Sequence, residues 1–233
     1  MKEILIFRHA AGEGPGYFAR FLDRHGLRYR VVRIDRNEPV PANIDDSAAL
    51  VLMGGPMSVN DPLPWIPKIL RLISEAMAAD RPVLGHCLGG QLLSKALGGT
   101  VTSNAVREIG WFPVRREANA EADDWLDGLT PEFEAFHWHG ETFTIPRGGS
   151  RILSSNACAN QGFVIGKALG LQCHVEMLPQ MVHDWARIGR EEIARPSDTV
   201  QSAEQMAEAL EERIGRLHRV ADVLYTRWMR GLT

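Results

Sequence analysis

The sequence predicts an α/β protein with a mostly parallel sheet flanked by helices, an antiparallel extension and a long C-terminal helix. Over residues 4–97, short apolar runs alternate with segments of helical periodicity, a pattern typical of parallel strands joined by crossover helices. From residue 109 to residue 174 the pattern changes to shorter strand-like runs, which indicates antiparallel pairing. Residues 1–233 are predicted to form one domain, since this length suits a single core.

Strands and helices alternate in the first part of the chain. In order, we predict a strand over 4–7, a helix over 15–24 closed by Gly26, strands over 29–34 and 50–53, a helix over 67–79, a strand over 82–84 and a helix over 88–97 that stops at Gly98-Gly99. The loop of residues 12–16 lacks the spacing of a phosphate-binding or dinucleotide fingerprint, so it is predicted to be a plain turn and Glu13 is assigned no role.

The second part is predicted to hold strands over 111–114, 134–138 and 163–165, a loop with a helix start at 195–198, and a terminal helix. The helix is indicated by an apolar stripe that Gly215 would weaken locally. Its members are Met206, Leu210, Ile214, Leu217, Ala221, Leu224 and Trp228. We expect this stripe to pack on the protein's own core; the alternative is a homodimer surface or a contact with a synthase subunit.

Cys87 lies between two glycines, in Gly85-His86-Cys87-Leu88-Gly89, where the strand over 82–84 meets the next helix. This arrangement is typical of a nucleophile elbow, in which a tight turn projects a reactive side chain into a cleft. The positive end of the helix dipole favours a thiolate there. An isolated cysteine is more often a small core residue, so the prediction depends on its partners.

His174 and Glu176 supply such partners at the end of a predicted strand. Residues two apart on an extended segment face the same side, so the Glu176 carboxylate is expected to hold one imidazole nitrogen while the other faces Cys87. The result is a Cys-His-Glu triad. The alternative makes His174 a core histidine and Glu176 a carboxylate at a helix start.

The loop Gly54-Gly55-Pro56 follows the apolar run ending at Met53. Glycines in such a loop can aim backbone N–H groups at a developing oxyanion, and the residue after the nucleophile commonly supplies another. We therefore predict the amides of Gly55 and Leu88 as the oxyanion donors, although an ordinary turn explains the loop equally well.

These motifs together resemble the class I, triad-type glutamine amidotransferases. The segments over 54–59, 85–91, 138–141 and 172–176 occur in that family's order and cover about residues 50–177. The resemblance implies Cys87 as nucleophile, His174 and Glu176 as its partners, and Gln91 near a bound glutamine. It also places His139 near the substrate, with a structural histidine as the alternative.

Two positions depart from the family pattern. Cys173 and Val175 stand where the family usually has phenylalanine and proline around the catalytic histidine. Both replacements are apolar, so we expect the triad geometry to survive, although the backbone loses a rigid restraint.

The resemblance implies cysteine-dependent hydrolysis of the glutamine side-chain amide, and among family members the chain is most similar to proteins labelled as the amidotransferase part of GMP synthase. No Ser-Gly-Gly-x-Asp-Ser synthase loop is present, so ammonia is expected to pass to a separate synthase. A stand-alone γ-glutamyl peptidase or hydrolase is the alternative. A non-catalytic regulatory protein with a vestigial triad is a third.

Composition narrows the remaining classes. The formal charge of −3 argues against a broad nucleic-acid surface, and no run is long enough for a signal peptide or a membrane span. We expect a cytoplasmic protein that needs no cofactor. Three cysteines without repeated Cys-x-x-Cys spacing indicate no zinc site, and Cys158 and Cys173 are expected to be reduced and buried.

Overall fold

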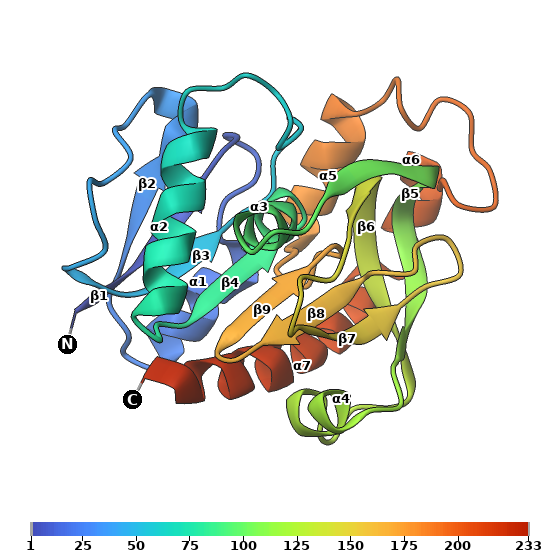
Figure 1. The fold of residues 1–233 in the computed structure, drawn as a ribbon. Coiled ribbons are helices and arrows are strands. Elements are labelled where there is room, and N and C mark those ends of the chain that lie inside the picture. The colour runs from blue at the N-terminus through green and yellow to red at the C-terminus, as the bar shows by residue number, and fades with distance from the viewer. Residues whose placement is uncertain (1, 233) are drawn as a thin grey trace.

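The computed structural model describes residues 2–232, and its strands form a nine-stranded sheet in the order β2-β1-β3-β4-β9-β8-β7-β5-β6 (Figure 1). The strands are β1 (Glu3–Arg8), β2 (Tyr29–Arg33), β3 (Ser47–Leu52), β4 (Val83–His86), β5 (Val101–Arg116), β6 (Glu132–Phe143), β7 (Ser150–Ser154), β8 (Gly162–Ile165) and β9 (Ala168–Leu171). The α-helices are α1 (Gly16–Arg24), α2 (Ile66–Ala78), α3 (Leu88–Ala96), α4 (Ala120–Trp125), α5 (Pro179–Ile188), α6 (Ala203–Ala207) and α7 (Leu210–Met229), and short 3-10 turns cover Ile34–Arg36 and Arg230–Leu232.

The half of the sheet that carries β2, β1, β3, β4 and β9 is parallel, which confirms the predicted α/β class. Side chains alternate across these strands, so Ile4 and Ile6 of β1 join one core while Leu5 and Phe7 join the other. Helices α1 and α7 cover the first face, and α2 and α3 cover the second. Strand β4 and the start of α3 thus lie near the centre of the sheet, where open α/β sheets bind their ligands.

The other half of the sheet is antiparallel from β9 through β8, β7 and β5 to β6. The predicted extension is confirmed, but its main strands are much longer than the short runs predicted, with 16 residues in β5 and 12 in β6. The outer part of β5, residues 102–107, is partly or fully exposed and mostly polar, so it shows no apolar strand pattern. Its pairing with β6 is irregular between Ser103 and Glu108.

The prediction of a single C-terminal helix from Met206 onwards is wrong in one respect, because the helix is interrupted between α6 and α7. Ser202 and Gln205 form a capping box that starts α6. The Trp111 indole then donates to the Met206 carbonyl oxygen at 3.1 Å, an oxygen that a continuous helix would have given to residue 210. Ala209 adopts a left-handed conformation with φ of 49° and resets the direction.

From Leu210 onwards the predicted apolar stripe is buried in the protein's own core, as expected. The predicted loop at 195–198 is also present, although the helix after it begins only at Ala203. Cys158 and Cys173 are buried and take part in no disulfide. Within residues 2–232, no helix combines the length and apolarity that crossing a bilayer requires.

Candidate active site

Cys87 occupies the sharp turn between β4 and α3. Its backbone has φ of 50° and ψ of −108°, a combination that non-glycine residues rarely adopt and that is typical of strained functional turns. The Cys87 amide donates to the Leu171 carbonyl of β9 at 2.8 Å, and its carbonyl accepts from Gln91 at 3.0 Å. The turn is therefore fixed from both sides, and the side chain is 6% exposed.

Glycines let α3 lie directly on the sheet behind this turn. A Cβ atom on Gly89 would be 2.0 Å from the Leu52 carbonyl oxygen of β3, and one on Gly90 would be 2.4 Å from the Leu171 carbonyl oxygen of β9. Neither position has room for a larger residue. The close approach sets where the helix N-terminus, and with it Cys87, stands relative to the strands.

His174 and Glu176 lie beside Cys87, but not at the end of a strand as predicted, because β9 stops at Leu171. His174 is held instead by an isolated bridge to β6, in which its amide donates to the Phe136 carbonyl at 2.8 Å. His174 Nδ1 is 2.7 Å from Glu176 Oε1. Both side chains are buried, and the imidazole and Trp185 rings meet edge to face with centroids 4.8 Å apart.

His174 and Glu176 stabilise each other's charged forms. Burial alone lowers the pKa of His174, but the negative charge of Glu176 and a hydrogen bond with Cys87 raise it well above its ordinary value. Burial alone raises the pKa of Glu176, but neighbouring histidine charge and the hydrogen bond with His174 lower it to about 2. Because burial also lowers the pKa of His86, the positive charge next to Glu176 at neutral pH resides on His174.

Two residues next to Glu176, His86 and Tyr225, were not predicted to belong to the site. His86 Nε2 lies 3.7 Å from Glu176 Oε2 and 3.0 Å from the hydroxyl oxygen of Tyr225, a residue of α7. The His86 ring and the Tyr225 ring meet edge to face. The terminal helix therefore reaches the interior side of the site. Tyr225 belongs to an ordinary core stripe, so no sequence signal distinguishes it.

A cleft of about 670 Å³ opens in front of Cys87. It is lined by Cys87, Gln91, Gly55 and His139, whereas His174 and Glu176 are not among its lining residues. The outer part of β5 and the Trp138 and Trp185 side chains form further walls. The sulfur is thus the member of the predicted triad that a ligand meets first.

The predicted oxyanion loop is adjacent to the elbow. A Cβ atom on Gly55 would be 2.7 Å from Leu88 Cδ2 and 2.6 Å from Met57 Sδ, so these segments are in contact. Leu88 is the first residue of α3, and the first amides of a helix have no partner within the helix. The loop therefore packs against the first residue of α3, while the pairing of the two amides at one oxygen stays a prediction.

Gln91 lines the cleft but is largely enclosed, with 3% of its surface exposed. Its side-chain nitrogen Nε2 donates to Gln172 Oε1 at 3.2 Å, and Gln172 Nε2 is 3.4 Å from Cys87 Sγ. Gln91 thus reaches the sulfur through Gln172. Gln91, predicted to lie near a bound glutamine, lines the cleft, and the sequence gave no indication of the Gln172 link.

Glu13, to which the sequence assigned no role, lines the same cleft. A Cβ atom on Gly54 would be 2.2 Å from Glu13 Oε2 and 3.2 Å from His174 Cε1, so the carboxyl group lies close to the histidine. Burial is the main reason that the pKa of Glu13 is raised to about 7, with the His174 charge opposing it. A carboxyl group with this pKa in a cleft is a typical functional candidate.

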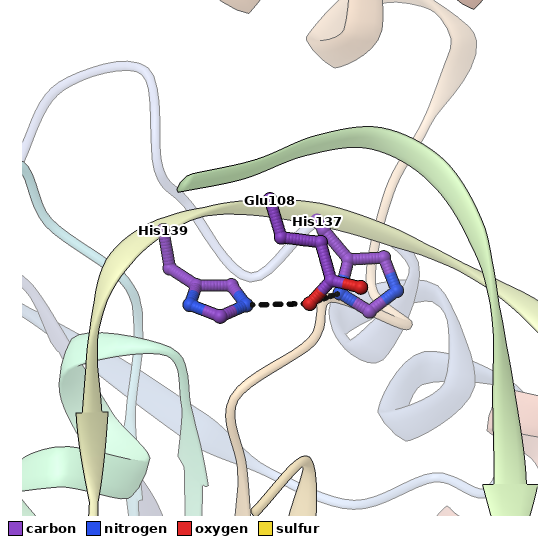
Figure 2. Close-up of side chains that lie close together, drawn as sticks. All are labelled: Glu108, His137 and His139. Carbon is purple, nitrogen blue, oxygen red and sulfur yellow. Dashed lines mark hydrogen bonds and ion pairs between the residues drawn. The ribbon is translucent and has the colours of Figure 1, made fainter. Parts of the chain in front are cut away.

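His139 lies at the cleft and is also fixed from behind. Its Nδ1 is 3.0 Å from the Glu141 carbonyl oxygen, and its Nε2 is 3.1 Å from Glu108 Oε2. His137 Nδ1 approaches the same carboxylate oxygen at 3.4 Å, and burial lowers the pKa of His137 to about 4. Glu108, His137 and His139 form a buried cluster whose candidate ligand atoms lie within 4.8 Å of one another (Figure 2).

Comparison with known families agrees with the fold. The model of the family described as glutamine amidotransferase class-I matches residues 18–183. The chain belongs to this family. The elbow, the Gly55 loop and the His174–Glu176 segment all lie within the matched part, whereas Glu13 precedes it.

Several amidotransferase relatives resemble this chain over most of its length. A putative glutamine amidotransferase-like protein, YfeJ from Salmonella typhimurium, is 27% identical over 80% of each chain. A subunit of the glutamine-hydrolysing GMP synthase of Sulfurisphaera tokodaii is 32% identical over 65% of this chain and 78% of its own. The crystal structure of a glutamine amido transferase from Methylobacillus flagellatus matches with a TM-score of 0.96 and 45% identity, covering 100% of this chain and 96% of that one.

Proposed function

We propose that this amidotransferase hydrolyses the side-chain amide of glutamine through a thioester on Cys87. The observation that carries the proposal is the Cys87 turn itself. Cys87 has a positive φ at a helix N-terminus and opens into a cleft, and a buried His174–Glu176 pair lies close to it. This combination supports a cysteine nucleophile assisted by an acid–base histidine.

In the first stage, the Cys87 sulfur attacks the γ-carbonyl carbon and a carbon–sulfur bond forms. The attacking species is proposed to be the thiolate, since this is the nucleophilic form of cysteine. The carbonyl oxygen becomes an oxyanion, for which we propose the Gly55 and Leu88 amides as donors. His174 then gives its proton to the leaving nitrogen as the carbon–nitrogen bond breaks, and ammonia departs.

In the second stage, neutral His174 accepts a proton from a water molecule that attacks the thioester carbon. The carbon–sulfur bond breaks, the sulfur leaves as a thiolate, and glutamate is released. Glu176 holds the His174 ring in one orientation and stabilises its charged form at each stage. Gln91 and His139 are proposed to contact the substrate from the cleft walls.

Transfer of the ammonia to a separate synthase is the leading proposal for its fate. The similarity to a protein named as one subunit of a glutamine-hydrolysing GMP synthase supports a partner that consumes ammonia. The expected sign of such a partner is a synthetase that co-purifies with this chain and raises its rate of glutamate release.

A stand-alone γ-glutamyl hydrolase is the second candidate, and the size of the cleft favours it. At about 670 Å³ the cleft is in the range typical of sites for drug-sized ligands, so it has room for a group attached beyond the γ-carbonyl. The chemistry on Cys87 would be unchanged, with an amine leaving in place of ammonia.

The test is glutamate release from glutamine and, in parallel, from a γ-glutamyl dipeptide, with Cys87→Ala as the control. Turnover that requires Cys87 supports the proposed chemistry, and the preferred substrate separates the two candidates. A folded protein whose Cys87 neither turns over these substrates nor reacts with a glutamine-like electrophile, alone or with a candidate synthetase, would instead be a binding protein with a vestigial triad.

A further inference from the structure

We propose that Glu108, His137 and His139 form a binding site for one divalent transition-metal ion, such as Zn²⁺, beneath the floor of the cleft. The proposal does not depend on glutamine hydrolysis. It follows from how β5 and β6 pair and from which atoms of the three side chains face one another (Figure 2).

Strand pairing brings the three side chains to one place. Glu108 is the cross-strand partner of His139 and is the first residue to pair after the irregular segment of β5. His137 is two residues from His139 on β6, so both rings project from the same face of the ribbon. The three side chains are almost completely enclosed, which removes the competition from water that weakens exposed sites.

The hydrogen bonds behind the two rings determine which nitrogen faces the carboxylate. His139 Nδ1 faces the Glu141 carbonyl oxygen at 3.0 Å, and His137 Nε2 faces the Phe112 carbonyl oxygen at 3.3 Å. A carbonyl oxygen only accepts, so in a neutral ring these nitrogens carry the hydrogen. The opposite nitrogens then present lone pairs to Glu108. Backbone carbonyls hold metal-ligating histidines in this same tautomer.

Lone pairs on two nitrogens and a carboxylate oxygen repel one another unless a proton on one of the nitrogens or a metal ion lies between them. His137 Nδ1 is buried without a hydrogen-bond partner, which is a costly arrangement for a group of this polarity. Further donors fix the Glu108 carboxylate. Ser155 Oγ donates to Oε1 at 2.9 Å and to Oε2 at 3.2 Å, and Gln161 Nε2, which is also 3.5 Å from His139 Nε2, donates to Oε2 at 2.5 Å. These partners orient a ligand as outer-shell groups do in metal sites.

The spacing also suits a small ion. Ligand atoms about 2.0–2.2 Å from a tetrahedral zinc ion lie about 3.3–3.6 Å from one another. Glu108 Oε2 is 3.1 Å from His139 Nε2 and 3.4 Å from His137 Nδ1. These two of the three distances are close to the required length, and the third, between the two ring nitrogens, is at most 4.8 Å, so the rings would move together on binding an ion. Two imidazoles and one carboxylate suit zinc and other divalent ions of the first transition row.

The test uses Co²⁺, whose visible absorption reports its ligands, and a Cys87→Ala background that removes the cleft thiol. We expect one Co²⁺ per chain, with d–d bands and no sulfur-to-cobalt charge transfer, and displacement by Zn²⁺. Against a chromogenic chelator, Glu108→Gln and His137→Gln should weaken binding by about 100-fold or more. His183→Gln, which changes an exposed histidine of α5, should leave binding unchanged.

Each variant is first tested for cooperative unfolding. If the ligand variants do not fold, X-ray absorption on the Zn²⁺-loaded Cys87→Ala protein decides, and two imidazoles with no sulfur neighbour is the expected result. No metal binding by the folded protein, a sulfur ligand, or an affinity that Glu108→Gln leaves unchanged would overturn the site. The Glu108–His139 contact would then be a plain ion pair of a carboxylate with an imidazolium.

Discussion

Replacing Gly89 by alanine tests whether α3 must lie directly on β3 for the site to form. The added Cβ would be 2.0 Å from the Leu52 carbonyl oxygen, whereas Cβ contacts below 3.0 Å essentially never occur. Helix α3 must therefore retreat by about 1 Å, and its N-terminus carries Cys87. Alanine favours a helix by about 1 kcal/mol over glycine, but overpacking against a backbone typically costs about 1–3 kcal/mol or more.

We expect Gly89→Ala to lower the free energy of unfolding by about 2 kcal/mol, measured by urea denaturation. Glutamate release should fall by about 100-fold, because a displacement of about 1 Å at a reacting group costs that much. Labelling of Cys87 by a glutamine-like electrophile gives a second readout of the same geometry if turnover needs a partner.

Gly215→Ala is the matched control. Gly215 lies in α7, where an alanine Cβ would have no atom within 4 Å apart from its chain neighbours and the helix's own backbone, and the backbone φ is not positive, so alanine fits there freely. The same substitution should then stabilise the protein by about 0.5–1 kcal/mol and leave activity unchanged. If Gly89→Ala is as stable and active as Gly215→Ala, the argument that backbone contact positions Cys87 is refuted.

Three further predictions concern the proposed triad, the cleft and the terminal helix. Glu176→Gln should lower kcat by about 10²–10⁴-fold, because His174 loses its charged partner. The control Glu75→Gln on α2 should leave kcat unchanged. Equal kcat values for the two variants in steady-state assays would contradict the role of Glu176. Glu13 has a pKa raised by burial, so its protonated form stabilises the fold below about pH 4.5 and this contribution is lost as pH rises through about 7. Glu13→Gln should therefore become more stable than wild type toward pH 8, by at most about 3 kcal/mol in the free energy of unfolding and by less where water screens the group. If urea denaturation gives the same difference between the two proteins at every pH, the role of Glu13 is contradicted. Leu217→Ala should lower the free energy of unfolding by about 2–5 kcal/mol at any protein concentration, because Leu217 is fully buried. A loss of stability that varies with protein concentration would instead indicate a dimer interface.

Periodicity and turn residues were sufficient to predict the parallel half of the fold. Strands such as β1 and β4 are apolar on both faces because helices cover both, and that pattern is visible in the sequence. The outer part of β5 escaped prediction because its side chains are exposed and polar, so only the partner strand identifies it. The break before α7 depends on a hydrogen bond from Trp111, a residue nearly a hundred positions away.

The candidate site divides in the same way. Cys87, His174 and Glu176 stand in local motifs, so their residue types and spacing were enough to nominate them. Glu13 and Glu108 were missed because each acquires its importance from the residues that enclose it. The alternation in His137-Trp138-His139 was the one available signal for the cluster, since two histidines two apart on a strand share a face.

The contact between Tyr225 and His86 has a consequence for engineering. Exchanging α7 between relatives looks harmless, because the helix carries no motif and stays outside the cleft. The exchange would nevertheless replace the hydroxyl that meets His86, and His86 is the neighbour of the Glu176 oxygen that has no hydrogen-bond partner. A chimera with phenylalanine in place of Tyr225 would keep its core packing but would have altered electrostatics around Glu176. An exchange of α7 should therefore keep Tyr225, His86 and Glu176 together from the same parent protein.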